Sequence, residues 1–112
     1  MSYKIKSRIW IESENNVLLG EGRVHLLKAI QDTGSLSKAA KSLNISYKKA
    51  WQLLDSVNKS AKKPVTINSI GGKGGGGAQL TEYGASLIKA FDEINMNCWA
   101  FLDDQLQKLE RL

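Results

Sequence analysis

The sequence predicts a mainly α-helical domain with small β-hairpins, an α+β fold, and three observations support this prediction. Residues 35–57 hold two short amphipathic helical patterns joined by a tight turn. Residues 3–12 and 65–70 alternate apolar and polar side chains, as half-buried strands do. Residues 85–112 contain neither glycine nor proline and keep apolar side chains at helical spacing.

The composition is that of one globular domain, which we expect to span residues 1–112. Hydrophobic residues make up 42% and charged residues 24% of the 112 residues, which is ordinary for a globule. No apolar run reaches membrane-spanning length, and the first residues lack a signal-peptide pattern, so we expect a cytoplasmic protein. The single cysteine, Cys98, and the single histidine, His25, provide neither an internal disulfide nor a thiolate or imidazole metal site. We expect no metal, no cofactor and no enzymatic activity, because a nucleophile with a base and paired carboxylates are also missing.

Positive charge is concentrated in the middle of the chain. The formal net charge is +5, and residues 23–73 carry ten basic against two acidic side chains, whereas residues 82–112 carry three against six. Lysines that neutralise phosphates release condensed counterions, so such a segment favours binding to a polyanion. A membrane surface would also require a basic amphipathic segment with an exposed bulky apolar face, and the sequence has none.

Residues 1–20 are predicted to form an N-terminal hairpin. Isoleucines alternate with charged side chains over residues 3–12, which indicates a half-buried strand. Asn15 and Asn16 are typical of a turn, and residues 17–19 form a short returning strand.

A three-helix core is predicted over residues 21–61. Its first helix covers residues 23–32. Gly34 suits a left-handed cap after that helix, and Ser35 suits the N-cap of the next one. Ser46 is placed to cap the third helix, and the order helix, tight turn, helix predicts a helix-turn-helix.

The third helix has an apolar face and a polar, cationic face. The apolar face consists of Ala50, Leu53, Leu54 and Val57, and the polar face of Lys48, Gln52, Ser56 and Lys59. This division is typical of a recognition helix in a DNA major groove. Trp51 lies between the two faces, and we interpret it as a packing residue rather than a DNA contact.

Residues 65–81 are predicted to form a wing, in which two strands flank a loop with six glycines among residues 71–77. The loop matches neither a dinucleotide-binding loop, which a helix must follow at once, nor a Walker loop, which needs Ser or Thr after its lysine. Its glycines either permit a wide turn or let the backbone approach a phosphate or groove floor. We favour the second interpretation, with Lys73 as the charged tip, because so many glycines carry a large entropic cost for a simple turn.

Residues 82–112 are predicted to form one helix capped by Thr81, roughly 45 Å long and therefore longer than its own domain. Its apolar residues form two successive seams, of which one can cover the core while the other needs a partner, most simply the same helix of a second subunit. The first seam contains Leu87, Phe91, Ile94, Cys98 and Phe101, and the second contains Trp99, Leu102, Leu106 and Leu109. The sequence leaves open which seam does which. The predicted dimer interface contains Phe91, Ile94, Cys98, Trp99, Leu102, Leu106 and Leu109.

Four motifs occur together over residues 24–88: Gly34-Ser-Leu-Ser, Ile45-Ser-Tyr-Lys-Lys-Ala-Trp, the glycine loop, and Leu80-Thr-Glu-Tyr-Gly. This set resembles the N-terminal DNA-binding domain of the ModE family of molybdate-responsive transcriptional regulators. The resemblance implies a winged helix-turn-helix related to that of LysR-type regulators, acting as a DNA-binding homodimer, with residues 46–57 as recognition helix. ModE continues into molybdate-binding domains and this chain stops at Leu112, so the resemblance implies DNA binding connected with molybdenum or tungstate, but no oxyanion sensing by this chain. Three alternatives for regulation stay open: constitutive binding, sensing through the dimer interface, and a separate effector-sensing protein.

We therefore expect a sequence-specific regulator that binds an inverted-repeat operator in double-stranded DNA as a homodimer. The predicted DNA-binding residues are Ser35, Ser37, Ser46, Tyr47, Lys48, Lys49, Gln52, Gly72, Lys73 and Gly74. Gln52 is suited to adenine and a lysine to guanine. The alternative is a winged-helix adaptor that binds a protein partner, for which a neutral recognition helix would be expected.

Overall fold

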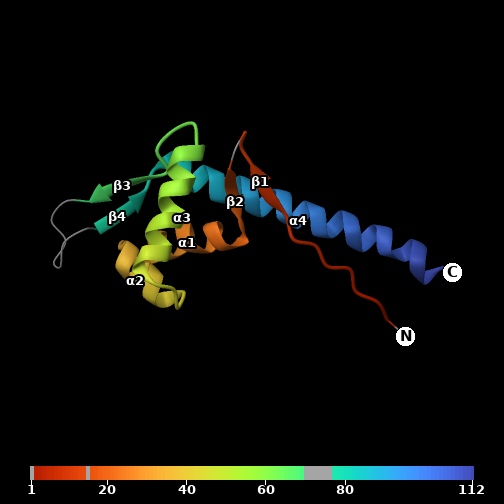
Figure 1. The fold of residues 1–112 in the computed structure, drawn as a ribbon. Coiled ribbons are helices and arrows are strands. Elements are labelled where there is room, and N and C mark those ends of the chain that lie inside the picture. The colour runs from red at the N-terminus through yellow and green to blue at the C-terminus, as the bar shows by residue number, and fades with distance from the viewer. Residues whose placement is uncertain (1, 15, 70–76) are drawn as a thin grey trace.

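The computed structural model describes residues 2–14, 16–69 and 77–112. A hairpin, three helices, a second hairpin and a long helix follow one another, which confirms the predicted mainly α-helical fold with two small hairpins (Figure 1). The elements are β1 (Trp10–Glu12), β2 (Val17–Gly20), α1 (Glu21–Thr33), α2 (Leu36–Ser42), α3 (Tyr47–Ser60), β3 (Thr66–Ser69), β4 (Gly77–Leu80) and α4 (Glu82–Glu110).

β1 is shorter than the predicted strand over residues 3–12. It has three residues and pairs antiparallel with the four residues of β2, so residues 3–9 have no strand beside them. From Lys4 to Ile9 the side chains nevertheless alternate between exposed and half-buried, as predicted. Ser7 Oγ lies 3.8 Å from Cys98 Sγ on α4, so α4 provides the surface that half-buries this segment.

The turns between the helices use the residues that the sequence indicates. Gly34 has a φ of 71° and its N–H donates to the Ile30 carbonyl oxygen over 2.8 Å, a left-handed cap that glycine adopts without strain. Ser35 Oγ accepts a hydrogen bond from the Lys38 N–H over 3.2 Å. Asn44, with a φ of 57°, makes the turn between α2 and α3, a position that asparagine tolerates better than most residues.

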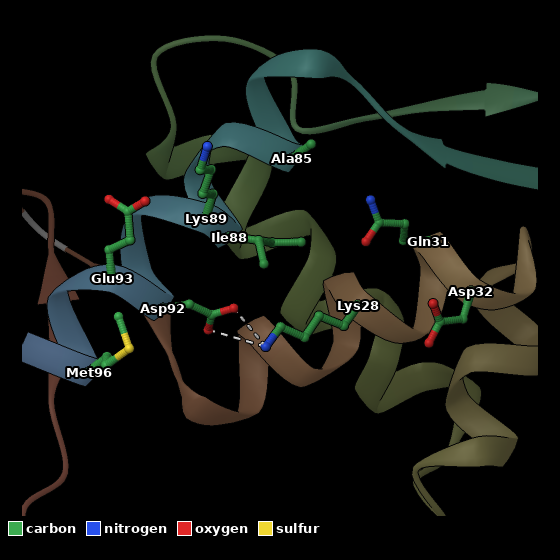
Figure 2. Close-up of a pocket in the computed structure, with 9 residues that line it drawn as sticks. All are labelled: Lys28, Gln31, Asp32, Ala85, Ile88, Lys89, Asp92, Glu93 and Met96. Carbon is green, nitrogen blue, oxygen red and sulfur yellow. Dashed lines mark hydrogen bonds and ion pairs between the residues drawn. The ribbon is translucent and has the colours of Figure 1, made fainter. Parts of the chain in front are cut away.

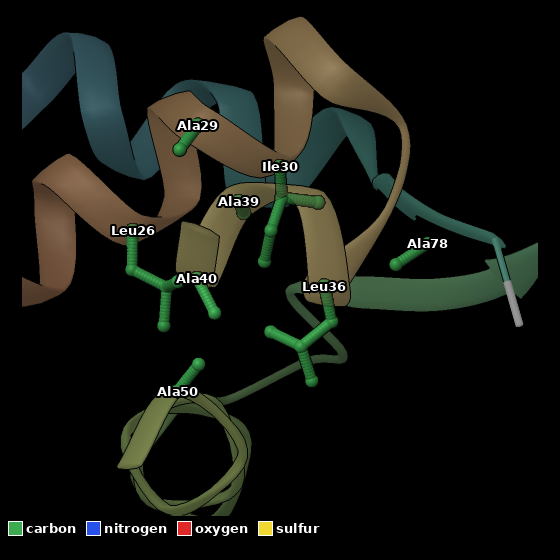
Figure 3. Close-up of a cluster of buried hydrophobic side chains, with 8 residues drawn as sticks. All are labelled: Leu26, Ala29, Ile30, Leu36, Ala39, Ala40, Ala50 and Ala78. Carbon is green, nitrogen blue, oxygen red and sulfur yellow. The ribbon is translucent and has the colours of Figure 1, made fainter. Parts of the chain in front are cut away.

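The core consists of two groups of buried side chains. The first, which we call the alanine-rich cluster, joins α1, α2, α3 and β4, and Figure 3 shows its side chains meeting between the three helices. It contains Leu26, Ala29, Ile30, Leu36, Ala39, Ala40, Ala50 and Ala78. Most of these residues are alanines, whose side chain is a single methyl group. The helices can therefore approach each other closely.

The second group, the large-residue cluster, connects the N-terminal hairpin and α4 to the helix-turn-helix. It contains Leu19, Val24, Leu27, Val57, Val65, Ile88 and Phe91. Every one of these side chains is at most 7% exposed, so this cluster holds the N-terminal hairpin, the helix-turn-helix and α4 together.

The second hairpin is joined to the helices at its base. β3 and β4 pair antiparallel from Thr66 opposite Leu80 to Ser69 opposite Gly77. Gly77 also bridges to Ser35, and the Ala78 N–H donates to the Gly34 carbonyl oxygen over 3.0 Å. The start of α2 and the base of this hairpin are therefore neighbours.

α4 belongs to the core only through its first turns. Thr81 Oγ1 accepts from the Gly84 N–H over 3.0 Å, which confirms the predicted cap, and Gly84, Ile88 and Phe91 are buried. The rest of this 29-residue helix projects away from the end that carries β3 and β4 (Figure 1), and the molecule measures 61 × 29 × 22 Å. Among the described residues, no helix combines the length and the apolar composition needed to cross a membrane.

The first apolar seam of α4 covers the core only at its start, through Leu87 and Phe91. Ile88, which belongs to neither predicted seam, is 7% exposed, whereas Ile94 and Phe101 of the first seam are 49% and 56% exposed. The reason is that the core ends near Phe91, so later positions of the same seam have no core to face. Phe91 itself, 4% exposed, is a core residue and does not face outward as the predicted interface would require.

Candidate nucleic-acid interface

The exposed side of α3 carries most of the predicted DNA-binding residues. The Lys49 N–H donates to Ser46 Oγ over 3.0 Å, so Ser46 is the N-cap of α3 and its hydroxyl is engaged in that role. Ala50 and Val57 are fully buried on the inner side of the helix. Burial of that side fixes the rotation of α3 about its own axis and leaves Lys48, Lys49 and Gln52 exposed on the outside.

Two aromatic side chains lie on the same exposed surface. Tyr47 is 57% and Trp51 is 51% exposed. The interpretation of Trp51 as a packing residue holds only in part, because about half of this residue remains open to solvent. Its position between the two faces of the helix, which the sequence indicates, places it beside β3 rather than in the core.

An acidic residue stands among the lysines of α3. Asp55 Oδ2 lies 2.8 Å from Lys59 Nζ, one helical turn further on. The pair neutralises Asp55 locally, so the cationic character of the exposed side depends on Lys48 and Lys49 near the start of the helix.

The start of α2 adds two predicted contacts next to the base of the second hairpin. Ser35 is half-buried and its side chain caps α2, while Ser37 is exposed. Since Gly77 bridges to Ser35, these serines lie where the hairpin leaves the helical core. The predicted contacts Gly72, Lys73 and Gly74 lie outside the described residues.

Asn58 connects α3 to the second hairpin, a role that the sequence does not reveal. Its Oδ1 accepts from the Val65 N–H over 2.8 Å, and its Nδ2 donates to Thr66 Oγ1 over 3.2 Å. Thr81 Oγ1 adds a bond to the Pro64 carbonyl oxygen over 2.7 Å. These bonds fix β3 relative to the exposed side of α3. No local pattern marks Asn58, because both of its partners come from the segment after the helix.

The predicted dimer-interface residues divide into three groups. Phe91 is in the core. Cys98, Leu102 and Leu106 are half-buried, and Cys98 contacts Ser7. Ile94 and Leu109, 49% and 48% exposed, and the more shielded Trp99, 37% exposed, remain open on the surface of this chain.

A groove of about 480 Å³ lies between α1 and α4 (Figure 2). Its walls carry acidic groups, Asp32, Asp92 and Glu93, as well as Lys28 and Lys89. Lys28 Nζ lies 2.9 Å from Asp92 Oδ2. Because acidic side chains stand beside the lysines of this groove, it is a poor site for a polyanion. Within the described part of the chain, no three His, Cys, Asp or Glu residues come together as metal ligands would.

Comparison with known proteins gives several ModE proteins among the relatives of this chain. The chain is 32% identical over 106 residues to the molybdenum transport protein ModE of Azotobacter vinelandii, covering 95% of this chain. It is 49% identical over 70 residues to the transcriptional regulator ModE of Yersinia pestis, covering 62% of this chain. The chain spans only 39% and 27% of the length of these two relatives. No protein-family model matches it.

Among solved structures, the chain is similar to the protein in the crystal structure of a CbnR_DBD-DNA complex. The TM-score is 0.60 at 15% sequence identity, and the match covers 82% of this chain and 99% of the other. This likeness concerns the fold, a winged helix-turn-helix. The sequence identities, which run over the N-terminal region of the longer regulators, show that the chain belongs to the ModE family.

Proposed function

We propose that this chain is the DNA-binding part of a transcriptional regulator of the ModE type. The observation that carries the proposal is the exposed side of α3, on which Lys48, Lys49 and Gln52 stand clear of the core. The hydrogen bonds of Asn58 to Val65 and Thr66 hold β3 next to this exposed side of α3. A helix with free basic and amide side chains, flanked by a hairpin, fits the major groove of double-stranded DNA.

We further propose that two copies bind an inverted repeat. Support comes from the projecting part of α4, where Ile94 and Phe101 are 49% and 56% exposed and lie seven residues apart. Residues at that spacing fall on one side of a helix, as in helices that pair. A twofold dimer presents two copies of α3, so the operator would have half-sites one helical turn or a multiple apart.

DNA binding is tested by fluorescence polarisation with a random duplex at two salt concentrations, followed by selection of bound sequences from a random pool. We expect binding that weakens with salt, and a recovered inverted repeat. Absence of binding at low salt would contradict the proposal and favour an adaptor with a protein partner.

Base recognition is tested by Lys48→Ala and Gln52→Ala. Each should weaken binding to the selected site by about 1 to 3 kcal/mol, and binding to random DNA by less, because a bidentate base contact is lost. Lys89→Ala is the matched control, since Lys89 is an exposed lysine in the groove between α1 and α4. Equal losses on both duplexes would show that the residue contacts only phosphate.

Dimerisation is tested by Phe101→Glu in sedimentation equilibrium. We expect the mass to fall from twice 12.4 kDa to 12.4 kDa. Met96→Glu is the control, because Met96 is 64% exposed and lies roughly 140° away from Phe101 around the helix. A wild-type protein that stays monomeric at high concentration would exclude this interface.

A connection with molybdenum is also proposed, and it rests on the name of the Azotobacter vinelandii relative. The selected inverted repeat should then occur upstream of genes for molybdenum or tungstate handling. Occurrence only before unrelated genes would contradict this part.

A further inference from the structure

A cleft between α3 and β3 is the starting point for a more specific inference. It has a volume of about 290 Å³ and is lined by Trp51, Leu54, Asp55, Asn58, Thr66 and Asn68. One wall is the recognition helix and the other is the first strand of the hairpin. When α3 lies in a major groove, a sugar–phosphate strand at the edge of that groove passes beside the helix, and β3 lies on one such side of α3.

The hydrogen bonds around Asn58 determine what Thr66 can offer in this cleft. Asn58 Nδ2 donates to Thr66 Oγ1 over 3.2 Å, so the hydroxyl acts as acceptor in that bond. A threonine hydroxyl has one proton of its own, and that proton remains for an acceptor outside the pair. Thr66 therefore presents a donor whose oxygen is held in place.

Two further side chains in the cleft have groups suited to a nucleic-acid backbone. Asn68 is exposed, and its amide can donate two hydrogen bonds. Trp51 is 51% exposed and combines a flat apolar ring with an indole N–H that can only donate. Neutral donors beside a flat apolar surface match phosphate oxygens beside the apolar face of a deoxyribose.

Asp55 is the lining group that would oppose a phosphate. Its Oδ2 lies 2.8 Å from Lys59 Nζ, and this partner reduces the repulsion. The cleft thus tolerates an anion but is not made attractive by charge, which distinguishes it from the lysines at the start of α3.

We propose that the α3–β3 cleft seats one sugar–phosphate strand of the duplex, with Trp51 against a deoxyribose and with Thr66 and Asn68 donating to phosphate oxygens. This inference rests on the proposed DNA binding, and it adds where one strand of the DNA duplex runs across the protein. Such contacts position the protein along the duplex and do not read bases.

The test compares Trp51→Ala and Asn68→Ala with wild type on the selected duplex and on a random duplex. Each variant should bind both duplexes roughly 2- to 10-fold more weakly, the range of one neutral hydrogen bond or contact. The salt dependence should stay that of wild type, because a neutral donor releases no counterions. Asp55→Asn should bind both duplexes more tightly.

Ile67→Ala is the matched control, because Ile67 lies on the same strand, is 53% exposed and points to the other side of β3 from its neighbours. Thr66→Ser and Thr66→Val form a second pair, in which serine keeps the hydroxyl and should restore the affinity lost with valine. Thermal melting of each variant separates lost contact from lost folding.

A neutral methylphosphonate placed at single phosphates of the selected duplex identifies the contacted position. At that position Asn68→Ala should cause no further loss, because its partner charge is already gone. If wild type binds the duplex and the Trp51 and Asn68 variants bind like Ile67→Ala, the cleft inference is wrong and the proposed function stands. If wild type binds no duplex, both are wrong.

Discussion

The two buried clusters differ in the size of their side chains and in what they hold together. The alanine-rich cluster joins α1, α2 and α3 through methyl groups such as those of Ala39, Ala40 and Ala50, all at most 2% exposed. The large-residue cluster joins the N-terminal hairpin and α4 to α1 and α3 through side chains such as Leu27 and Phe91. Small side chains bury little surface but set the distance between helices, whereas large ones bury the area that stabilises the fold.

This difference indicates a division of tasks. The alanine-rich cluster decides how α3 is presented, because it determines how α2 and α3 cross. The large-residue cluster decides whether α4 stays attached. Substitutions in the two clusters should accordingly affect the free energy of unfolding and DNA binding to different degrees.

The largest effect is expected for Phe91→Ala in the large-residue cluster. Removing a ring that is 4% exposed should lower the free energy of unfolding by about 3 to 5 kcal/mol, measured by urea denaturation. Met96→Ala, at a 64% exposed position further along the same helix and away from the proposed dimer interface, should change it far less. Similar losses for both would show that α4 does not contribute to the core through Phe91.

Gly84→Ala should cause the second-largest loss in the free energy of unfolding. A Cβ at Gly84 would overlap the Val65 carbonyl oxygen and lie 3.0 Å from Val65 Cγ1, and backbone cannot move aside as a flexible side chain can. A loss of about 3 kcal/mol is expected. Gly22→Ala in α1 is the control, because nothing lies within 4 Å of its Cβ; it should stabilise the protein by about 0.4 to 1 kcal/mol. Stabilisation by both alanines would refute the close approach of α4 to Val65.

Ala50→Leu tests the alanine-rich cluster. Ala50 is fully buried, and extra methylene groups there should cost about 2 kcal/mol. Because the added volume pushes α3 away from α2, DNA affinity should fall even at temperatures where the variant remains folded. A variant that loses stability but keeps full affinity would show that this cluster does not set the presentation of α3.

The smallest effect is expected for Ser46→Ala. It removes the 3.0 Å bond between Ser46 Oγ and the Lys49 N–H and should cost about 1 kcal/mol, visible as a lower denaturation midpoint. Ser46→Asp should restore stability, since aspartate also caps helices, but should weaken DNA binding by its charge. Loss of binding with alanine at unchanged stability would instead assign Ser46 a phosphate contact.

Much of this fold could be predicted because its signals are local. Gly34, Ser35, Ser46 and Thr81 act as caps within three or four residues of their own positions, and the apolar spacing of α3 identifies its buried side. The helix-turn-helix followed by a hairpin was recognisable for the same reason. The exposed lysines of α3 follow directly from which side is buried.

The missed features depend on segments that are distant in the sequence or on how far the core extends. Residues 3–9 alternate as a strand does, but β2 is too short to pair with them. Trp51 is open because its neighbour is the edge of β3, and Asn58 is engaged by residues that follow the helix. The seams of α4 could not be assigned because the sequence does not show that the core ends at Phe91.

The sequence by itself determined the order of elements, their caps, and a cationic third helix, since each depends on short-range spacing and on charge. Only the tertiary structure decided that Asn58 fixes β3 against α3, that a polar cleft opens between them, and that Ile94 and Phe101 remain exposed. Those outcomes depend on where separate segments meet in space, and contacts between segments follow from packing of the whole chain rather than from any single pattern within it.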